Sequence, residues 1–196
     1  MKYVFQIFKE AMLLIKANLR TTLITTIIGS VVALVLISHC PISYVLIILP
    51  MFFGIVVSSL AFVRENKEVE IANIFAPLKA GNYWKILSLY GWMYLFTLLW
   101  SLLWVVPGVI KALGYSLAPY ILADNPDIAP KEAMNKSAKM MNGYKGHLFL
   151  MWLMLIAVVY ASLWCRGIPL LVIIPFAVIV MAKFYNHVKA AAEAAN

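Results

Sequence analysis

The sequence contains few charged residues and little cysteine. Charged side chains make up 12% of its 196 residues, about half of what soluble domains carry. Hydrophobic residues make up 64%, so the chain cannot hide its apolar surface from water by folding on itself. This composition indicates that a lipid bilayer surrounds much of the protein. The two cysteines, Cys40 and Cys165, lack the spacing of a metal site. An outer disulfide is geometrically conceivable, but we expect two unpaired thiols.

Catalytic motifs are also missing. The chain has no His-Glu-x-x-His, no Gly-x-Ser-x-Gly and no phosphate-binding glycine loop. Asp124, Asp127 and His147 are candidates for an interfacial hydrolase or metal site, but the residue set that a reaction needs is absent. We therefore expect no enzymatic activity, no metal and no cofactor. The net charge of +8 is not arranged as the basic, aromatic-interleaved face of a nucleic-acid binder, so we expect no nucleic-acid partner.

Long apolar runs are the dominant feature of the sequence. Each is long enough, or nearly so, to cross a hydrocarbon core of ~30 Å. The runs cover residues 21–39, 42–63, 83–106, a shorter one ending near 123, 148–164 and 168–185. Short breaks, among them Pro41 and Arg166-Gly167, join the runs in pairs. The sequence therefore predicts an all-α fold, a polytopic transmembrane helix bundle of six spans arranged as three hairpins.

An amphipathic segment precedes each hairpin, at residues 1–20, 71–82 and 128–142. Such segments tend to lie in the membrane interface. In the third, the predicted buried face consists of Ala133, Met134, Ser137, Met140 and Met141. Gly143 has the position of a glycine that ends this helix. With the hairpins, these segments form a single membrane domain of three pseudo-repeats, about 1–63, 64–127 and 128–196.

The basic residues predict the topology. Fourteen of the sixteen Lys and Arg residues flank the spans on one side, and the exceptions are Lys111 and Arg166. Because cytoplasmic loops are enriched in Lys and Arg, we expect a multi-pass plasma-membrane protein with both termini in the cytoplasm.

Residues 99–128, LWSLLWVVPGVIKALGYSLAPYILADNPDI, contain the candidate functional site. Pro107-Gly108 is the predicted turn of the hairpin. After it, Tyr115 and Pro119 share a helix face with Lys111, and together with Tyr120 they form a candidate ligand groove. An intramembrane Lys is by default a functional candidate. The alternative for Lys111 is that its long stem reaches the headgroups near the outer end of the span.

The polar end of this stretch has a structural interpretation. Asp124 and Asn125 suit a helix terminus that leads into a turn, and Pro126 stops the helix. Asp127 precedes the next helix, where a carboxylate can bind free backbone N–H groups.

The same stretch strongly resembles the signature of a family of bacterial integral membrane proteins known only as a domain of unknown function, number nine-seventy-five in that series. The resemblance continues through EAMNKSAKMMNGYKGHLF, with a Ser…Met-x-Gly element at Ser137, Met141 and Gly143, and reaches Phe184-Tyr185. After Leu150 the chain departs from the family's usual Leu-Ser-Phe-Ile-Gly-Trp-like run and its Thr-Leu-Gly-Ile-Gly turn. The resemblance implies a polytopic bacterial membrane protein and no established activity.

From these features we expect a non-enzymatic membrane protein that binds or passes a lipid, peptide or other amphiphile. The irregular fourth span with Lys111, Tyr115 and Pro119 motivates this expectation, because irregular helices often flank binding sites. The alternative is a structural or accessory subunit. It would bind a protein partner, a second copy of the chain or anionic lipid through its basic cytoplasmic face.

Overall fold

The computed structural model describes residues 2–17, 46–47, 49–65, 71–79, 81–164 and 170–194. The predictions for the first span, for Cys40 and Cys165 and for the turn at Arg166 lie outside these residues. Within them the chain is helical and contains no strand, which confirms the all-α prediction for this part. The helices are α1 (Lys2–Ala17), α4 (Leu49–Glu65), α5 (Ile71–Lys79), α6 (Tyr83–Leu103), α7 (Val105–Tyr115), α8 (Ala118–Asp124), α9 (Pro130–Met140), α10 (Lys145–Trp164) and α11 (Leu170–Ala194).

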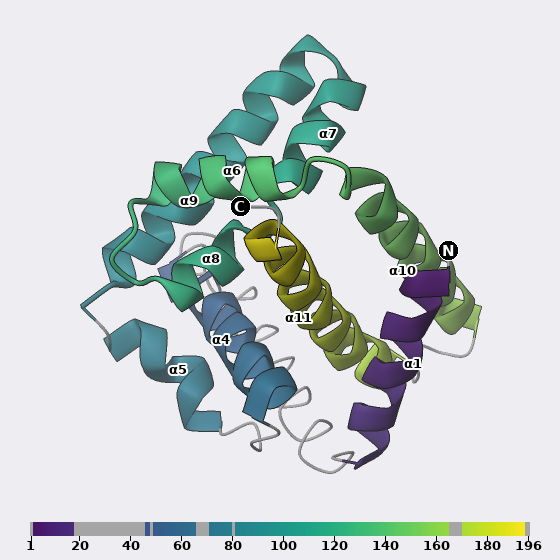
Figure 1. Cartoon of the computed structure of the whole chain (residues 1–196). Helices are drawn as coiled ribbons and strands as arrows, with labels where there is room; N and C mark the ends of the chain where they lie inside the picture. Colours follow the sequence, from purple (N-terminus) through teal and green to yellow (C-terminus); the bar gives the residue numbers. More distant parts are fainter. Residues whose placement is uncertain are drawn as a thin grey trace.

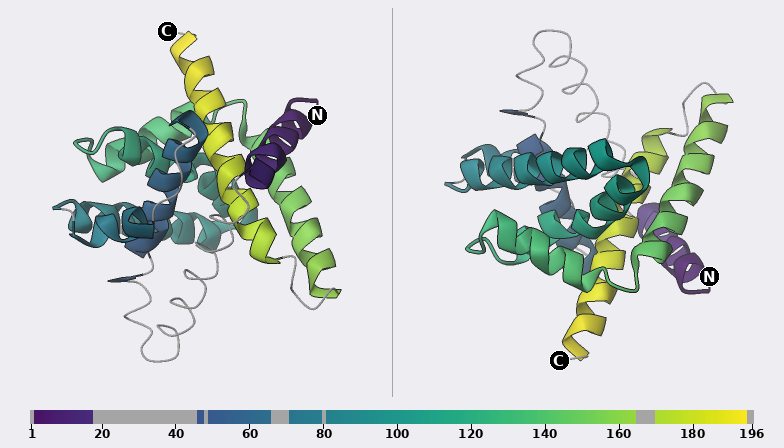
Figure 2. Two further views of the ribbon diagram at one scale, coloured as in Figure 1. Left: turned by 90° about the horizontal axis from the view of Figure 1, so that it is seen from below. Right: turned by 90° about the horizontal axis from the view of Figure 1, so that it is seen from above.

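The C-terminal helix α11 lies at the centre of the bundle (Figure 1). It packs against α4 on one side and against α1 and α10 on the other (Figure 2). Val180, Phe184 and Val188 are fully buried, and their spacing of four places them on one helical stripe. The sequence predicts a last span that fades after Tyr185, but α11 continues to Ala194. The burial of Val188 and the alanine-rich composition of the tail explain this extension.

The amphipathic segments predicted before each hairpin form α1, α5 and α9. In α9, Ala133, Met134 and Ser137 are buried and the lysines at 131, 136 and 139 are exposed, as the helical periodicity predicts. In α1, Ile7 and Ala11 are buried, and Phe8 meets Phe176 of α11 edge to face with ring centroids 5.1 Å apart. Helix α9 ends at Met140 with Met141 as its cap residue, and Gly143 lies two residues beyond that cap with a φ of 85°, a backbone conformation that favours glycine.

The turn between α6 and α7 lies at Trp104, three residues before the predicted Pro107-Gly108 turn. Trp104 has extended backbone angles, and Pro107 and Gly108 lie in the first turns of α7. A proline is accommodated there because N–H groups in the first turn of a helix have no helical partner. Gly108 instead permits close packing, because a Cβ at this position would lie 2.8 Å from Cα of Ser101 in α6.

Replacing Gly108 with alanine should therefore destabilise the hairpin. The overpacking against Ser101 costs about 1–3 kcal/mol, and the gain in helix propensity offsets up to ~1 kcal/mol of that. Gly91 of α6 provides the control, since a Cβ there meets nothing within 4 Å. Thermal unfolding in detergent should show a lower midpoint for Gly108→Ala and an unchanged or higher one for Gly91→Ala. Equal midpoints for the two variants would contradict the close packing.

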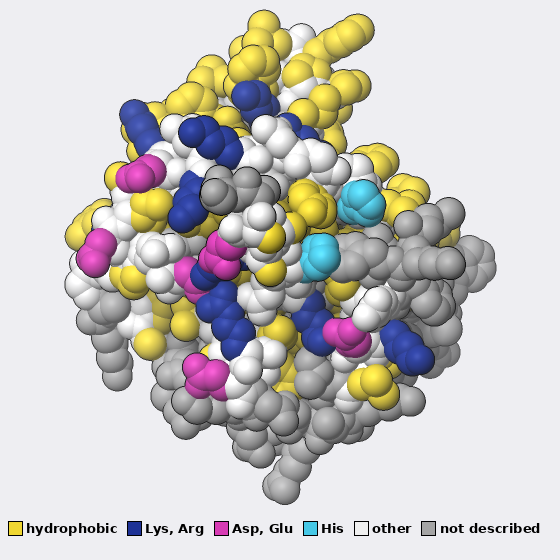
Figure 3. Space-filling model, in the orientation of Figure 1, with side chains coloured by type: hydrophobic (Ala, Val, Ile, Leu, Met, Phe, Trp, Pro, Cys, Tyr) yellow, Lys and Arg dark blue, Asp and Glu magenta, His cyan; other side chains and the backbone are white. Residues whose placement is uncertain are grey.

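The α6–α7 hairpin projects from the rest of the molecule, and hydrophobic side chains cover it, whereas Lys and Arg gather below it (Figure 3). Leu102, Leu103 and Trp104 at its tip are almost fully exposed. Two helical segments, Tyr83–Leu103 and Val105–Asp124, are long and apolar enough to cross a membrane. A third span is possible if two consecutive helical segments count as one. These are Pro130–Met140 and Lys145–Tyr160, whose axes differ in direction by 94°. The described residues thus support two or three of the six predicted spans.

Candidate functional site

The predicted fourth span is broken at Ser116 and Leu117, between α7 and α8. Pro119 lies in the first turn of α8 and has no N–H group to continue the helical hydrogen-bond pattern. The N–H of Ser116 turns back to the carbonyl of Leu113 at 3.4 Å. The break leaves the carbonyl of Gly114 and the N–H of Leu117 in need of partners inside the protein.

Ser137 of α9 supplies both partners. Its Oγ donates a hydrogen bond to the carbonyl oxygen of Gly114 at 2.6 Å and accepts one from the N–H of Leu117 at 3.2 Å. The serine is 0% exposed, so water does not compete for these groups. Met141, one turn further along, is also fully buried. Ser137 therefore fixes α9 to the break between α7 and α8.

Asp124, the last residue of α8, is the centre of a cluster of charges. Its carboxylate accepts two hydrogen bonds from Arg64 of α4, at 2.7 and 3.0 Å. It accepts two more from α11, from Nζ of Lys189 at 2.7 Å and from the Tyr185 hydroxyl at 2.8 Å. The Asp124 side chain is 9% exposed. We call Arg64, Asp124, Tyr185 and Lys189 the Asp124 cluster, and it joins the ends of α4 and α8 to α11.

Further contacts hold the cluster's arginine in place. The Oδ1 of Asn186 accepts from Nε of Arg64 at 3.0 Å and from a terminal guanidinium nitrogen at 2.9 Å. The guanidinium lies 5.9 Å from the Tyr185 ring centre, and Tyr120 stacks on Tyr185 at 5.4 Å. The hydrogen bond to Asp124 raises the pKa of Arg64 above its usual value. Both cations contact the one carboxylate, so the arrangement serves to hold α4, α8 and α11 together.

The four predicted groove residues lie in two places. Lys111 is in the projecting hairpin, half-buried, with its Nζ 4.6 Å from the Trp100 ring centre. Tyr115, Pro119 and Tyr120 are buried, and Tyr120 contributes to the packing around the Asp124 cluster. A ligand groove through all four remains a prediction.

The turn after Asp124 is largely as predicted. The N–H and the side-chain amide of Asn125 both bond to the carbonyl of Ile121, and the carbonyl of Pro126 accepts from Lys85 at 2.5 Å. The predicted capping of α9 by Asp127 is wrong. Pro130 begins α9, so Ala129 is its cap residue and no side chain caps it, while Asp127 is exposed.

In the part of the chain that the structure describes, no three His, Cys, Asp or Glu side chains are grouped so that they could hold a metal ion. The carboxylate of Asp124 already accepts four hydrogen bonds. His147 lies beside Tyr144, with ring centroids 6.2 Å apart. The candidate hydrolase or metal site at Asp124, Asp127 and His147 thus has no assembled set of ligands among these residues.

In the part of the chain that the structure describes, the protein is thus helical, and two or three of its helices are apolar enough to span a membrane. Residues 103–192 match the model of a family described as "Protein of unknown function (DUF975)", which confirms the resemblance inferred from the sequence. No curated protein and no solved structure matches the chain. The matched segment contains Ser137, Asp124, Tyr185 and Lys189, whereas Arg64 lies before it.

Proposed function

We propose that this protein is a six-span plasma-membrane protein, with cytoplasmic termini, that binds or passes a lipid, peptide or other amphiphile without catalysing a reaction. The observation that carries the proposal is the position of Lys111, a cation among the exposed apolar side chains of the projecting hairpin. An amphiphile needs an apolar surface for its chain and a charge for its head, and this surface offers both.

The surroundings of Lys111 suit such a ligand. Trp100, Val109 and Ile110 are exposed beside it and offer apolar area to an acyl chain or an apolar side chain. The ammonium group lies over the Trp100 ring, a contact worth about 2 kcal/mol when it is desolvated. That contact holds the cation near the helix surface, seven residues or about 10 Å from the hairpin tip at Trp104. The remaining N–H donors are available to an anionic head group.

The contacts at the helix ends support the proposed topology. Positive-inside reasoning places the ends of the second, fourth and sixth spans on the cytoplasmic side. Arg64, Asp124 and Lys189, which lie at or just beyond those three ends, meet in the Asp124 cluster. Lys85 at the start of the third span contacts Pro126 just after the fourth, so these segments share one side of the bundle.

A specific observation favours a second candidate, an accessory subunit that binds a protein partner, a second copy or anionic lipid. Helix α9 buries its apolar face and exposes Lys131, Lys136 and Lys139. Lys131 lies 3.9 Å from the Trp92 ring centre, which orders the start of the helix. A basic helix of this kind attracts anionic surfaces at about 1 kcal/mol per Lys.

Native mass spectrometry of the protein, extracted under mild conditions from its own membrane, tests the first proposal. The wild type should retain a lipid or peptide of defined mass, and Lys111→Met should lower the retained fraction about tenfold, the ratio for one lost charge-assisted hydrogen bond. Lys139→Met makes the same chemical change on α9 and should leave retention unchanged. If Lys111→Met and Tyr115→Phe both leave retention unchanged, the groove is refuted. A ligand-free complex with a protein subunit or a second copy would favour the accessory role.

A further inference from the structure

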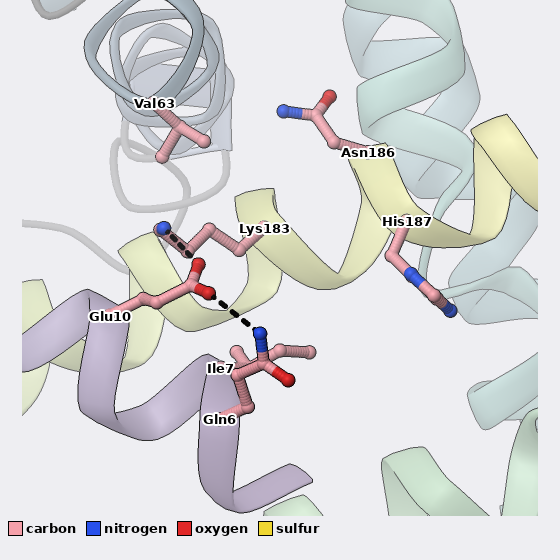
Figure 4. A pocket seen from close by; sticks show the side chains of 7 residues that line it. All are labelled: Gln6, Ile7, Glu10, Val63, Lys183, Asn186 and His187. Atoms are coloured by element: carbon pink, nitrogen blue, oxygen red, sulfur yellow. Dashed lines mark hydrogen bonds and ion pairs between the residues drawn. The ribbon is translucent and has the colours of Figure 1, made fainter. Parts of the chain in front are cut away.

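A cavity of about 400 Å³ lies between α1, α4 and α11, away from the hairpin residues around Lys111 (Figure 4). Its volume falls within the range of about 300–1,000 Å³ that is usual for small-molecule sites. The residues that line it include Gln6, Ile7, Glu10, Val63, Lys183 and Asn186. The cavity shares none of these with the hairpin surface around Lys111.

Opposite charges face each other at this cavity. Lys183 of α11 bonds to Oε2 of Glu10 in α1 at 2.7 Å, and Gln6 donates to Oε1 of Glu10 at 3.2 Å. The hydrogen bond from Lys183 holds the pKa of Glu10 below its usual value, so the carboxylate is ionised at neutral pH. The Glu10 side chain is 46% exposed, and ion pairs of this kind contribute only about 0–1 kcal/mol. A ligand that satisfies both charges can therefore separate them at little cost.

Asn186 adds an oriented polar group. Its Oδ1 is occupied by two hydrogen bonds from Arg64, which leaves the amide nitrogen as the group to offer a ligand. Figure 4 shows this nitrogen directed to the side on which Val63 of α4 lies. Lys183 and Asn186 thus provide N–H donors from α11, and Glu10 provides an acceptor from α1. The complementary ligand carries an anion and an ammonium group a short distance apart.

The outer side of α1 indicates where such a ligand comes from. Met12 and Leu13 are exposed there, and so is Lys9. A helix that exposes both apolar and basic side chains lies at the boundary between lipid headgroups and acyl chains. In the proposed membrane setting, a cavity directly behind α1 opens at the level of the headgroups.

We propose that this cavity binds the zwitterionic headgroup of a phospholipid that carries a primary amine. The phosphate bonds to Lys183 and the amide of Asn186, and the ammonium group bonds to Glu10. The lipid and free phosphoethanolamine both carry this phosphate and this ammonium group. The exposed apolar side chains of α1 favour the lipid, because they can contact its acyl chains. The inference rests on the proposed membrane setting, although it concerns a site separate from Lys111.

Native mass spectrometry of the full chain in detergent, with equal amounts of phosphatidylethanolamine and phosphatidylglycerol added, provides the test. The wild type should bind one phosphatidylethanolamine with a preference of about tenfold, the ratio for one charge-assisted hydrogen bond. Glu10→Gln should abolish the preference, because the amine loses its carboxylate. Val63→Phe should abolish binding by filling the cavity without changing any charge. Glu132→Gln, which is exposed on α9, is the charge-matched control for Glu10→Gln and should bind as the wild type does.

Three results would overturn the inference. The first is an unchanged lipid preference in both Glu10→Gln and Val63→Phe, with thermal midpoints showing that both variants fold. The second is displacement of the lipid by an equal concentration of free phosphoethanolamine, which would make the ligand a soluble phosphate ester. The third is loss of the phosphatidylethanolamine adduct in Lys111→Met but not in Val63→Phe, which would assign the lipid to the hairpin. Conversely, failure of Lys111→Met to affect any ligand would refute the groove alone.

Discussion

Replacing Ser137 with alanine is expected to lower the free energy of unfolding by about 2–4 kcal/mol. The substitution removes the partner of the Gly114 carbonyl and of the Leu117 N–H at a position that water does not reach. An unpaired buried backbone group costs about 1–3 kcal/mol, and the break in the helix leaves both groups without a helical alternative. The loss is therefore larger than for a serine that bonds within an intact helix.

Ser162 of α10 provides the matched control for this prediction. It is buried to a similar degree, and its hydroxyl donates to the carbonyl of Val158 within the same helix. That carbonyl belongs to an uninterrupted helix and retains its backbone partner, so Ser162→Ala should cost less than about 1 kcal/mol. Unfolding by a denaturing detergent, followed by tryptophan fluorescence, measures both variants. Equal losses would show that Ser137 does not compensate for the break.

The Asp124→Ala variant should be destabilised by about 2–3 kcal/mol. The substitution leaves Arg64 and Lys189 close together with no carboxylate between them, and it removes the acceptor of the Tyr185 hydroxyl. Removing one partner from a fully buried ion pair costs about 3–5 kcal/mol. The expected value is lower because Arg64 and Lys189 are about one third exposed and water can solvate them in part.

Asp127, three residues along the chain and exposed, is the control for Asp124. Asp127→Ala should change the free energy of unfolding by no more than about 0.5 kcal/mol. Asp124→Asn should fall between wild type and Asp124→Ala, because an amide oxygen still accepts a hydrogen bond without the charge. The same unfolding assay ranks the three variants. If Asp124→Ala and Asp127→Ala unfold alike, the cluster does not hold the helix ends together.

The helices were predictable from the sequence because apolar runs and helical periodicity depend on neighbouring residues. The boundary between α6 and α7 was placed three residues too late, at Pro107 instead of Trp104. A proline stops the preceding helix several residues upstream and is itself accommodated in the first turn of the next one. The sequence pattern shows the breaker, but not on which side of it the turn forms.

The partners of the polar residues were not predictable in the same way. Asp124 was correctly placed at a helix end, yet its partners Arg64 and Tyr185 lie 60 and 61 residues away. No local pattern reports contacts at that separation. Similarly, periodicity placed Ser137 on the buried face of α9, but only the packing of α9 on α7 and α8 reveals the two backbone groups that it binds. The sequence does mark Arg64 as a residue at the end of a span, because it is a charged residue directly after an apolar run.

The Asp124 cluster also has a consequence for the order of assembly during synthesis. Arg64 and Asp124 leave the ribosome well before Tyr185 and Lys189, which supply two of the four hydrogen bonds to the carboxylate. Before α11 is made, the carboxylate of Asp124 therefore has only the arginine of this cluster as a donor. Insertion of α11 completes the set, so this later helix decides when the bundle reaches its full stability.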